Sequence, residues 1–268
     1  MGSAIARTAF DELGAAGLTL LRLALSALLL LVVLRPRVRQ WSGRSWRAAV
    51  LLGATMAGMN LAFYLSIRTV PLGVAVTVEF VGPLLLALVQ SRRFLDVVWA
   101  LLAAAGVGLL GLSSTDGIPV SGLLLALLAG LFWAGYIVAS ARLGQAMPGM
   151  DGLVVSLGVA ALLVLPFGAR GASGVVGDPS LLAVAFAVAV LSSVLCYGLE
   201  LAALRRLSTR VFGILMSLEP AAAALAGLLV LGQRLAPREV VALVLVSVAS
   251  AGVTLGRRRD AVPTQPLE

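Results

Sequence analysis

The stretch VPLGVAVTVEFVGPLLLALVQ, residues 70–90, is long enough to cross a lipid bilayer and carries one charge, Glu79, near its middle. A transmembrane helix needs about 20 predominantly apolar residues. Residues 208–231 form a second apolar stretch, with Glu219 in its interior. An ionised Asp at the bilayer centre costs about 2.5 to 3.5 kcal/mol, and intramembrane acids usually face a bundle interior or a water-filled cavity. Both stretches are therefore predicted to be membrane helices whose acids mark a functional site.

A proline accompanies each of these acids. Pro83 follows Glu79 by four residues, and Pro220 follows Glu219 directly. Proline removes a backbone donor and kinks a helix, and broken helices are tolerated in membranes where they are buried in protein or line a cavity. We expect both helices to be kinked beside their carboxylates.

The composition of the whole chain is that of a membrane protein. Hydrophobic residues make up 60% of its 268 residues, and the mean hydropathy is +1.07, whereas soluble domains are about 45–50% apolar. The connectors between the apolar blocks are too short to hold a soluble domain, so the function should lie inside a polytopic, all-α bundle. The predicted spans are residues 14–34, 47–67, 70–90, 95–113, 120–141, 152–168, 180–204, 208–231 and 237–256.

The basic residues, all of them arginine, alternate between sides of the predicted membrane. One set of connectors holds Arg35, Arg37, Arg39, Arg44, Arg47, Arg92, Arg93, Arg142, Arg205, Arg206, Arg210, Arg257, Arg258 and Arg259, and the other holds Arg68, Arg170, Arg234 and Arg238. The positive-inside rule places the richer set, and with it the C-terminus, in the cytoplasm. Because these arginines are dispersed and lack interleaved aromatics, the net charge of +8 does not indicate nucleic-acid binding.

The two halves of the chain show a weak internal repeat. Residues 60–83 align with residues 197–220 at a constant offset, which pairs Pro83 with Pro220 but leaves the acids about one turn apart. Apolar sequences also produce such matches by chance. The connectors at Arg68 and Arg205 belong to opposite sides, so the repeats would be inverted, an arrangement that places a solute site at their interface near the midplane.

The first half shows one span fewer than the second. Residues 1–10 are too few to cross a membrane and resemble the end of a helix rich in small residues. We expect either a first helix truncated in this chain or a start that lies further upstream. A signal peptide is disfavoured, because no basic segment precedes a long apolar core.

Five stretches together resemble a known family: GAAGLTLLRL (residues 14–23), GMNLAFYLSIRTVPLG (58–73), VEFVGP (78–83), WAGYIV (133–138) and SLEP (217–220). They are similar to the EamA branch of the drug/metabolite transporter superfamily, and to its threonine/homoserine exporter-like members. The resemblance implies ten helices in two inverted five-helix repeats, here residues 1–115 and 116–257, with the first helix incomplete. It also implies a central cavity and export of small metabolites across a bacterial-type plasma (inner) membrane. We expect residues 258–268 to form a disordered cytoplasmic tail.

The polar and aromatic side chains within the predicted spans are the candidates for a substrate site. Arg22 could neutralise one of the acids or hold a carboxylate of the solute. For Asn60 and Thr77 the alternative is hydrogen bonding between helices, and for the aromatics it is packing or a place at the membrane boundary. The candidates are Arg22, Asn60, Tyr64, Thr77, Glu79, Trp133, Tyr136, Tyr197 and Glu219.

The two acids have two open interpretations. A structural carboxylate capped by backbone donors beside a proline kink would have the same sequence pattern as a functional one. If they are functional, a proton and an entering ammonium group would compete for the carboxylate, which predicts a proton-coupled exporter of amino acids such as threonine or homoserine.

Other functional classes fit the sequence less well. The chain has no histidine and no Gly-x-Ser-x-Gly, His-Glu-x-x-His or Walker motif, so neither an enzyme nor a bound cofactor or metal is expected. Cys196 is the only cysteine and is interpreted as a packing residue. The alternative to a carrier is a non-transporting membrane scaffold or a lipid translocator. The expected partners are a small-molecule substrate and the lipid bilayer, with the chain acting as a monomer or a homodimer.

Overall fold

The computed structural model describes residues 2–89, 94–112, 118–147, 149–196 and 216–256. Within these ranges every regular element is a helix, which confirms the predicted all-α class. The elements are α1 (Gly2–Thr8), α2 (Phe10–Leu34), η1 (Val38–Gln40), α3 (Gly43–Ser66), α4 (Leu72–Glu79), α5 (Val81–Val89), α6 (Phe94–Leu112), α7 (Val120–Ala146), α8 (Asp151–Ala172), η3 (Ser173–Val176), α9 (Pro179–Ala189), η4 (Val190–Val194), α12 (Glu219–Leu231) and α13 (Pro237–Gly256).

The lengths and surfaces of these helices are those of a multi-pass membrane protein. In the part of the chain that the structure describes, four helical stretches are long and apolar enough to cross a bilayer: Phe10–Leu34, Gly43–Ser66, Val120–Ala146 and Asp151–Val176. Large apolar side chains are exposed on α2 and α8, among them Val33 at 73% and Leu162 at 69%. Such apolar surfaces suit lipid rather than water.

The predicted span at residues 70–90 is divided into α4 and α5 at Phe80. In a continuous helix the amide of residue 83 would donate to the carbonyl of Glu79, but proline has no amide hydrogen. In the second stretch, α12 begins at Glu219 with Pro220 in its first turn. Pro83 therefore interrupts the first acid-bearing segment, as predicted. Residues 208–215 of the second span lie outside the described part of the chain.

Helix α2 contains a kink of its own. The sequence predicted a span beginning at Gly14, whereas the helix starts earlier, at Phe10, and bends at Gly14. Gly14 has φ of 64° and ψ of 160°, a backbone conformation that glycine adopts without the penalty that a side chain would bring. The kink separates the first turn of α2 from the long segment that carries Arg22.

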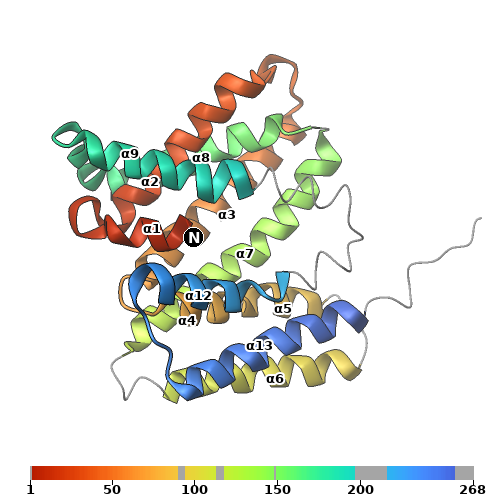
Figure 1. Ribbon diagram of the computed structural model, residues 1–268. Coiled ribbons are helices and arrows are strands. Elements are labelled where there is room, and N and C mark those ends of the chain that lie inside the picture. The colour runs from red at the N-terminus through yellow and green to blue at the C-terminus, as the bar shows by residue number, and fades with distance from the viewer. Residues whose placement is uncertain (1, 90–93, 113–117, 148, 197–215, 257–268) are drawn as a thin grey trace, which may run out of the picture.

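The helices pack in pairs that join distant parts of the chain (Figure 1). Helix α2 packs along α8, and α9 adjoins α2. Helix α4 packs against α12, and α6 against α13, in the lower part of the view. Helix α3 contacts both α7 and α8, and α7 also contacts α4 and α5. This arrangement brings α2, α3, α4, α7 and α12 around the residues that the sequence marks as functional.

Candidate functional site

Glu79 is the last residue of α4 and is buried, only 9% exposed. Its main-chain carbonyl cannot receive the usual helical hydrogen bond, because the donor would be the amide of Pro83. The break between α4 and α5 thus lies at the carboxylate itself. An acid at a buried helix break has backbone groups as well as a side chain available to a ligand, which is the arrangement found at transporter binding sites.

Two glycines allow α7 to approach this break closely. A Cβ atom added to Gly82 would collide with the carbonyl oxygen of Gly130, and one added to Gly130 would collide with the carbonyl oxygen of Glu79. Small residues at such crossings let helix backbones come into direct contact. The α4–α5 break is therefore held against the backbone of α7.

Arg22 of α2 is also buried, 9% exposed. Its Nη1 donates to the hydroxyl of Tyr64 at 3.3 Å, and its guanidinium lies 5.5 Å from the centre of the Tyr64 ring. Its Nη2 donates to the carbonyl of Ser192 at 3.2 Å. Tyr64 is fully buried and packs against Phe10, with the ring centres 5.6 Å apart. Arg22 is thus held by α3 and by the π-helical segment η4.

The charged residues of the site influence one another. Glu79 interacts electrostatically with Arg22, which has the opposite charge, and with Glu219, which has the same charge. Glu219 is half-buried and is the first residue of α12, where the partial positive charge of a helix N-terminus favours a carboxylate. The structure therefore brings together the two acids and the intramembrane arginine that the sequence singled out separately.

Asn60 and Thr77 are buried, but each donates a hydrogen bond within its own helix. The Asn60 amide donates to the carbonyl of Met56 at 2.8 Å, and the Thr77 hydroxyl donates to the carbonyl of Gly73 at 2.7 Å. Such bonds back to the preceding turn satisfy a polar side chain in an apolar helix and often bend it. Thr77 lies one turn before the break at Phe80. Its hydrogen bond to the Gly73 carbonyl can therefore help to bend the chain there.

The aromatic candidates have different surroundings. Trp133 of α7 is half-buried and meets the ring of Phe80 edge-on, with the ring centres 5.1 Å apart. It therefore packs directly on the α4–α5 break. Tyr136 is also half-buried but packs against the separate apolar core that α2, α3, α7 and α8 share. Tyr197 lies outside the described residues.

Reasoning from sequence did not identify Ser192, which belongs to the π-helical segment η4. Its carbonyl accepts from Arg22, while its own hydroxyl is buried and has no hydrogen-bond partner among the described residues. π-Helical segments are rare and occur frequently at functional sites. No sequence signal predicts one, because residues 190–194 (VLSSV) read as ordinary apolar helix.

The known proteins that this chain resembles in sequence are transporters. The model of the EamA-like transporter family matches residues 120–255. The chain is 42% identical over 261 residues to the threonine/homoserine exporter RhtA of Escherichia coli (strain K12), covering 97% of this chain and 88% of that relative. The same values hold for the threonine/homoserine exporter RhtA of Salmonella typhimurium (strain LT2).

Proposed function

Because the chain belongs to the EamA-like transporter family, we propose that it is a secondary transporter that exports small amino acids such as threonine and homoserine across the inner membrane. The names of the RhtA relatives support this substrate class. The observation that carries the proposal is the burial of Glu79 and Arg22, two opposite charges, within one electrostatically coupled site.

An amino acid is a zwitterion whose two charged groups are complementary to this pair. In the proposed complex the substrate ammonium group binds Glu79, and the substrate carboxylate binds the guanidinium of Arg22. Tyr64 and the Ser192 carbonyl orient that guanidinium. The hydroxyl of Ser192, which has no hydrogen-bond partner among the residues that the structure describes, provides a hydrogen-bonding group beside the same arginine. Charge-assisted bonds of this kind are roughly twice as strong as neutral ones.

Proton coupling follows from the same carboxylate. Glu79 can hold a proton or an ammonium group but not both, so protonation would release the substrate. Glu219 carries the same charge and interacts with Glu79, which makes simultaneous ionisation of the two acids costly. We expect an inward proton gradient to accelerate export from proteoliposomes, and we expect Glu79→Gln to remove that acceleration.

We also propose that the helices form two inverted repeats, residues 1–115 and 116–257. The packing supports this symmetry, because equivalent helices of the two halves lie against each other: α2 with α8, α4 with α12, and α6 with α13. The contact of α3 with α7 then corresponds to that of α9 with α1. Glu79 and Glu219 would lie near the axis that relates the repeats, where sites of inverted-repeat transporters are found.

The direct test is counterflow of radiolabelled threonine and homoserine in proteoliposomes. We expect wild-type protein to show saturable flux, and Glu79→Gln and Arg22→Gln to raise KM or reduce flux about tenfold or more, since hydrogen bonds to charged groups are worth about 1.5–3 kcal/mol. Glu12 is exposed on α2, so Glu12→Gln is the matched control and should transport normally. Absence of flux in well-folded wild-type protein would overturn the substrate assignment, and normal flux in Glu79→Gln would overturn the role of the carboxylate.

A further inference from the structure

The start of α4 is bound by a side chain from the other half of the chain. The amide of Leu72, the first residue of α4, donates to Oε1 of Gln233 at 2.9 Å. The first amides of a helix have no partner within the helix, and Pro71, which precedes α4, has no side-chain oxygen that could accept from them. Gln233 therefore takes the place of an N-cap residue, although it lies 161 positions away in the sequence.

The backbone of Gln233 is fixed at the end of α12. Gly232 ends this helix with a φ of 65°, a left-handed conformation that glycine adopts without strain. The amide of Gln233 then donates back to the carbonyl of Gly227 at 3.1 Å. The backbone of Gln233 thus belongs to the end of α12, and its side chain reaches across to α4.

Tight packing of α4 on α12 surrounds this hydrogen bond. A Cβ atom added to Gly73 would lie 2.7 Å from the Cα atom of Ala224, which is closer than atoms can approach. One added to Gly227 would lie 3.5 Å from the Cβ atom of Leu72, in ordinary contact. Small residues let the backbones of two membrane helices approach in this way. The end of α12 is therefore packed directly on the start of α4.

This contact lies on the side of the protein that the arginine distribution places outside. Arg68 precedes α4 and Arg234 follows Gln233, and both arginines belong to the outer set. The two acids lie at the other ends of these helices, because Glu79 is the last residue of α4 and Glu219 is the first residue of α12. A route from the acids to the outside between α4 and α12 is therefore closed where Gln233 joins them.

Other elements hold the connector that leads into α4. Arg7 of α1 donates to the carbonyls of Val70 and Arg68, both at 3.3 Å. The hydroxyl of Ser66, at the end of α3, donates to the carbonyl of Gly122 in the first turn of α7 at 2.8 Å. Elements from both halves of the chain thus meet at the outer end of α4.

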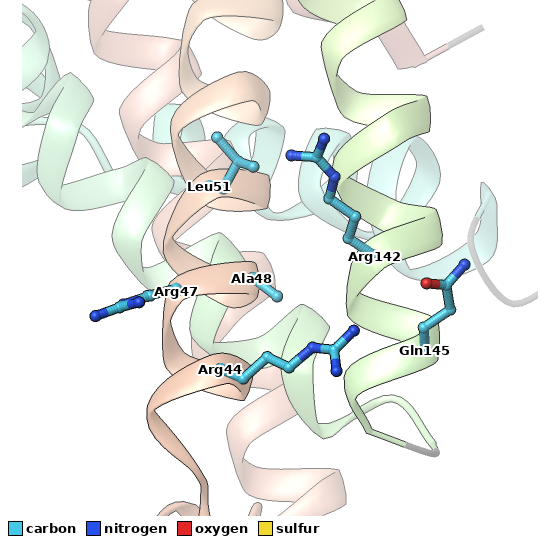
Figure 2. Close-up of a pocket in the computed structure, with 6 residues that line it drawn as sticks. All are labelled: Arg44, Arg47, Ala48, Leu51, Arg142 and Gln145. Carbon is cyan, nitrogen blue, oxygen red and sulfur yellow. The ribbon is translucent and has the colours of Figure 1, made fainter.

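The inner ends of α3 and α7 are arranged differently. Figure 2 shows a pocket of about 360 Å³ between the start of α3 and the last turns of α7, although the Ser45 hydroxyl still reaches the Ala146 carbonyl at 3.4 Å. The residues that line this pocket are Arg44, Arg47, Ala48, Leu51, Arg142 and Gln145. Among the described residues, space between the two halves is thus found on the inner side, as is expected of a carrier that is closed to the outside.

We propose that the hydrogen bond between Gln233 and Leu72 is a latch, which holds α4 and α12 together at the outer face and opens each time a solute leaves to the outside. In inverted-repeat carriers one repeat rocks against the other around a fixed site, so contacts between the halves at one face must separate. The Leu72 amide lies at a helix end, where water can replace Gln233 as its partner, so the latch can open reversibly. The proposal rests on the transport function and the two repeats proposed above.

The first test locks the contact with a disulfide in a Cys196→Ser background. The Cβ positions of residues 72 and 227 are 3.5 Å apart, and disulfides join Cβ atoms about 3.5–4.5 Å apart, so Leu72→Cys with Gly227→Cys should cross-link on oxidation. The disulfide then replaces the latch, because Oε1 of Gln233 lies 2.8 Å from the new Cβ position and must move aside. We expect oxidation to abolish threonine counterflow in the double variant, a reductant to restore it, and each single variant to be unaffected. Failure to cross-link, or unchanged flux in the cross-linked protein, would overturn the proposal.

The second test removes the latch and needs no transported solute. Ala226 of α12 lies in the apolar core and is 2% exposed, so Ala226→Cys in the same background should react slowly with a membrane-impermeant maleimide in intact cells. We expect Gln233→Ala to raise this rate about fivefold, the effect of losing one typical hydrogen bond. Arg234→Ala is the matched control, because Arg234 is exposed in the same connector, and it should leave the rate unchanged. An unchanged rate in Gln233→Ala, or an equal rise in Arg234→Ala, would contradict the latch.

Together the two tests separate failure of the latch from failure of the proposed function. If the Cys196→Ser background and the reduced double variant show no counterflow of threonine or homoserine, the substrate assignment is wrong, and the labelling rates still decide the latch. If both transport normally and the cross-linked protein does so too, the latch is wrong and the transport function stands.

Discussion

Tyr64 connects the arginine of the proposed site to the apolar core, through a hydroxyl that accepts from Arg22 and a ring that packs against Phe10. Tyr64→Phe keeps the ring and removes the acceptor, so we expect a rise in transport KM of about fivefold, which corresponds to the ~1 kcal/mol of a typical hydrogen bond. Its Tm should change little. Tyr64→Ala removes a fully buried ring and should destabilise the protein by about 3–5 kcal/mol. Counterflow kinetics and thermal unfolding measure both effects, and an unchanged KM in Tyr64→Phe would show that the hydroxyl does not position Arg22.

The contacts of single residues were the part of the structure that the sequence predicted least completely. Glu79, Glu219 and Arg22 could be selected because a charge in an apolar segment is conspicuous, and the structure places Glu79 where it interacts electrostatically with the other two. The pairing of Arg22 with Tyr64 and with the Ser192 carbonyl could not be predicted. A backbone carbonyl has no sequence signature, and Arg22 and Ser192 are 170 positions apart.

At the scale of the helix, the break between α4 and α5 can be tested by restoring the missing donor. Pro83→Ala would supply an amide that can donate to the Glu79 carbonyl, and it would remove a penalty of about 3 kcal/mol for proline inside a helix. We expect a higher Tm together with a several-fold lower flux, because the straightened helix no longer presents the carboxylate at a break. Pro166→Ala in the interior of α8 is the matched control and should leave flux unchanged. Equal loss of flux in the two variants would mean that the break has no special role.

The close approach of α7 to the α4–α5 break can be tested with two glycine substitutions in α7. Gly130→Ala would drive a methyl group into the Glu79 carbonyl, and overpacking of this kind costs about 1–3 kcal/mol. Gly144, further along α7, has no atom within 4 Å of an added Cβ. Gly144→Ala should stabilise the helix by about 0.5–1 kcal/mol, the usual advantage of alanine over glycine. Opposite shifts in Tm are therefore expected, and a neutral Gly130→Ala would contradict the tight crossing.

The sequence predicted the existence and type of most helices better than their partners. Long apolar runs bounded by arginine, glycine and proline located α2, α3, α7 and α8 to within a few residues. These runs are apolar on nearly every side, as membrane helices are, so they lack the amphipathic stripe that shows which face is buried. Helix pairs such as α2 with α8, and α6 with α13, therefore had to come from the structure.

For the whole molecule, the arginine distribution predicts which ends of the helices lie in the cytoplasm. It places the C-terminal end of α7, with Arg142, and the C-terminus of the chain inside. Cys196 is the only cysteine, so Cys196→Ser provides a background for single-cysteine labelling. Val176 in η3 is 88% exposed and lies near Arg170, on the side predicted to be outside. Gln145 is exposed in the last turn of α7, on the side predicted to be inside. A membrane-impermeant maleimide should label Val176→Cys in intact cells and Gln145→Cys only after permeabilisation. The reverse pattern would invert the molecule in the membrane and contradict the orientation that the arginine distribution predicts.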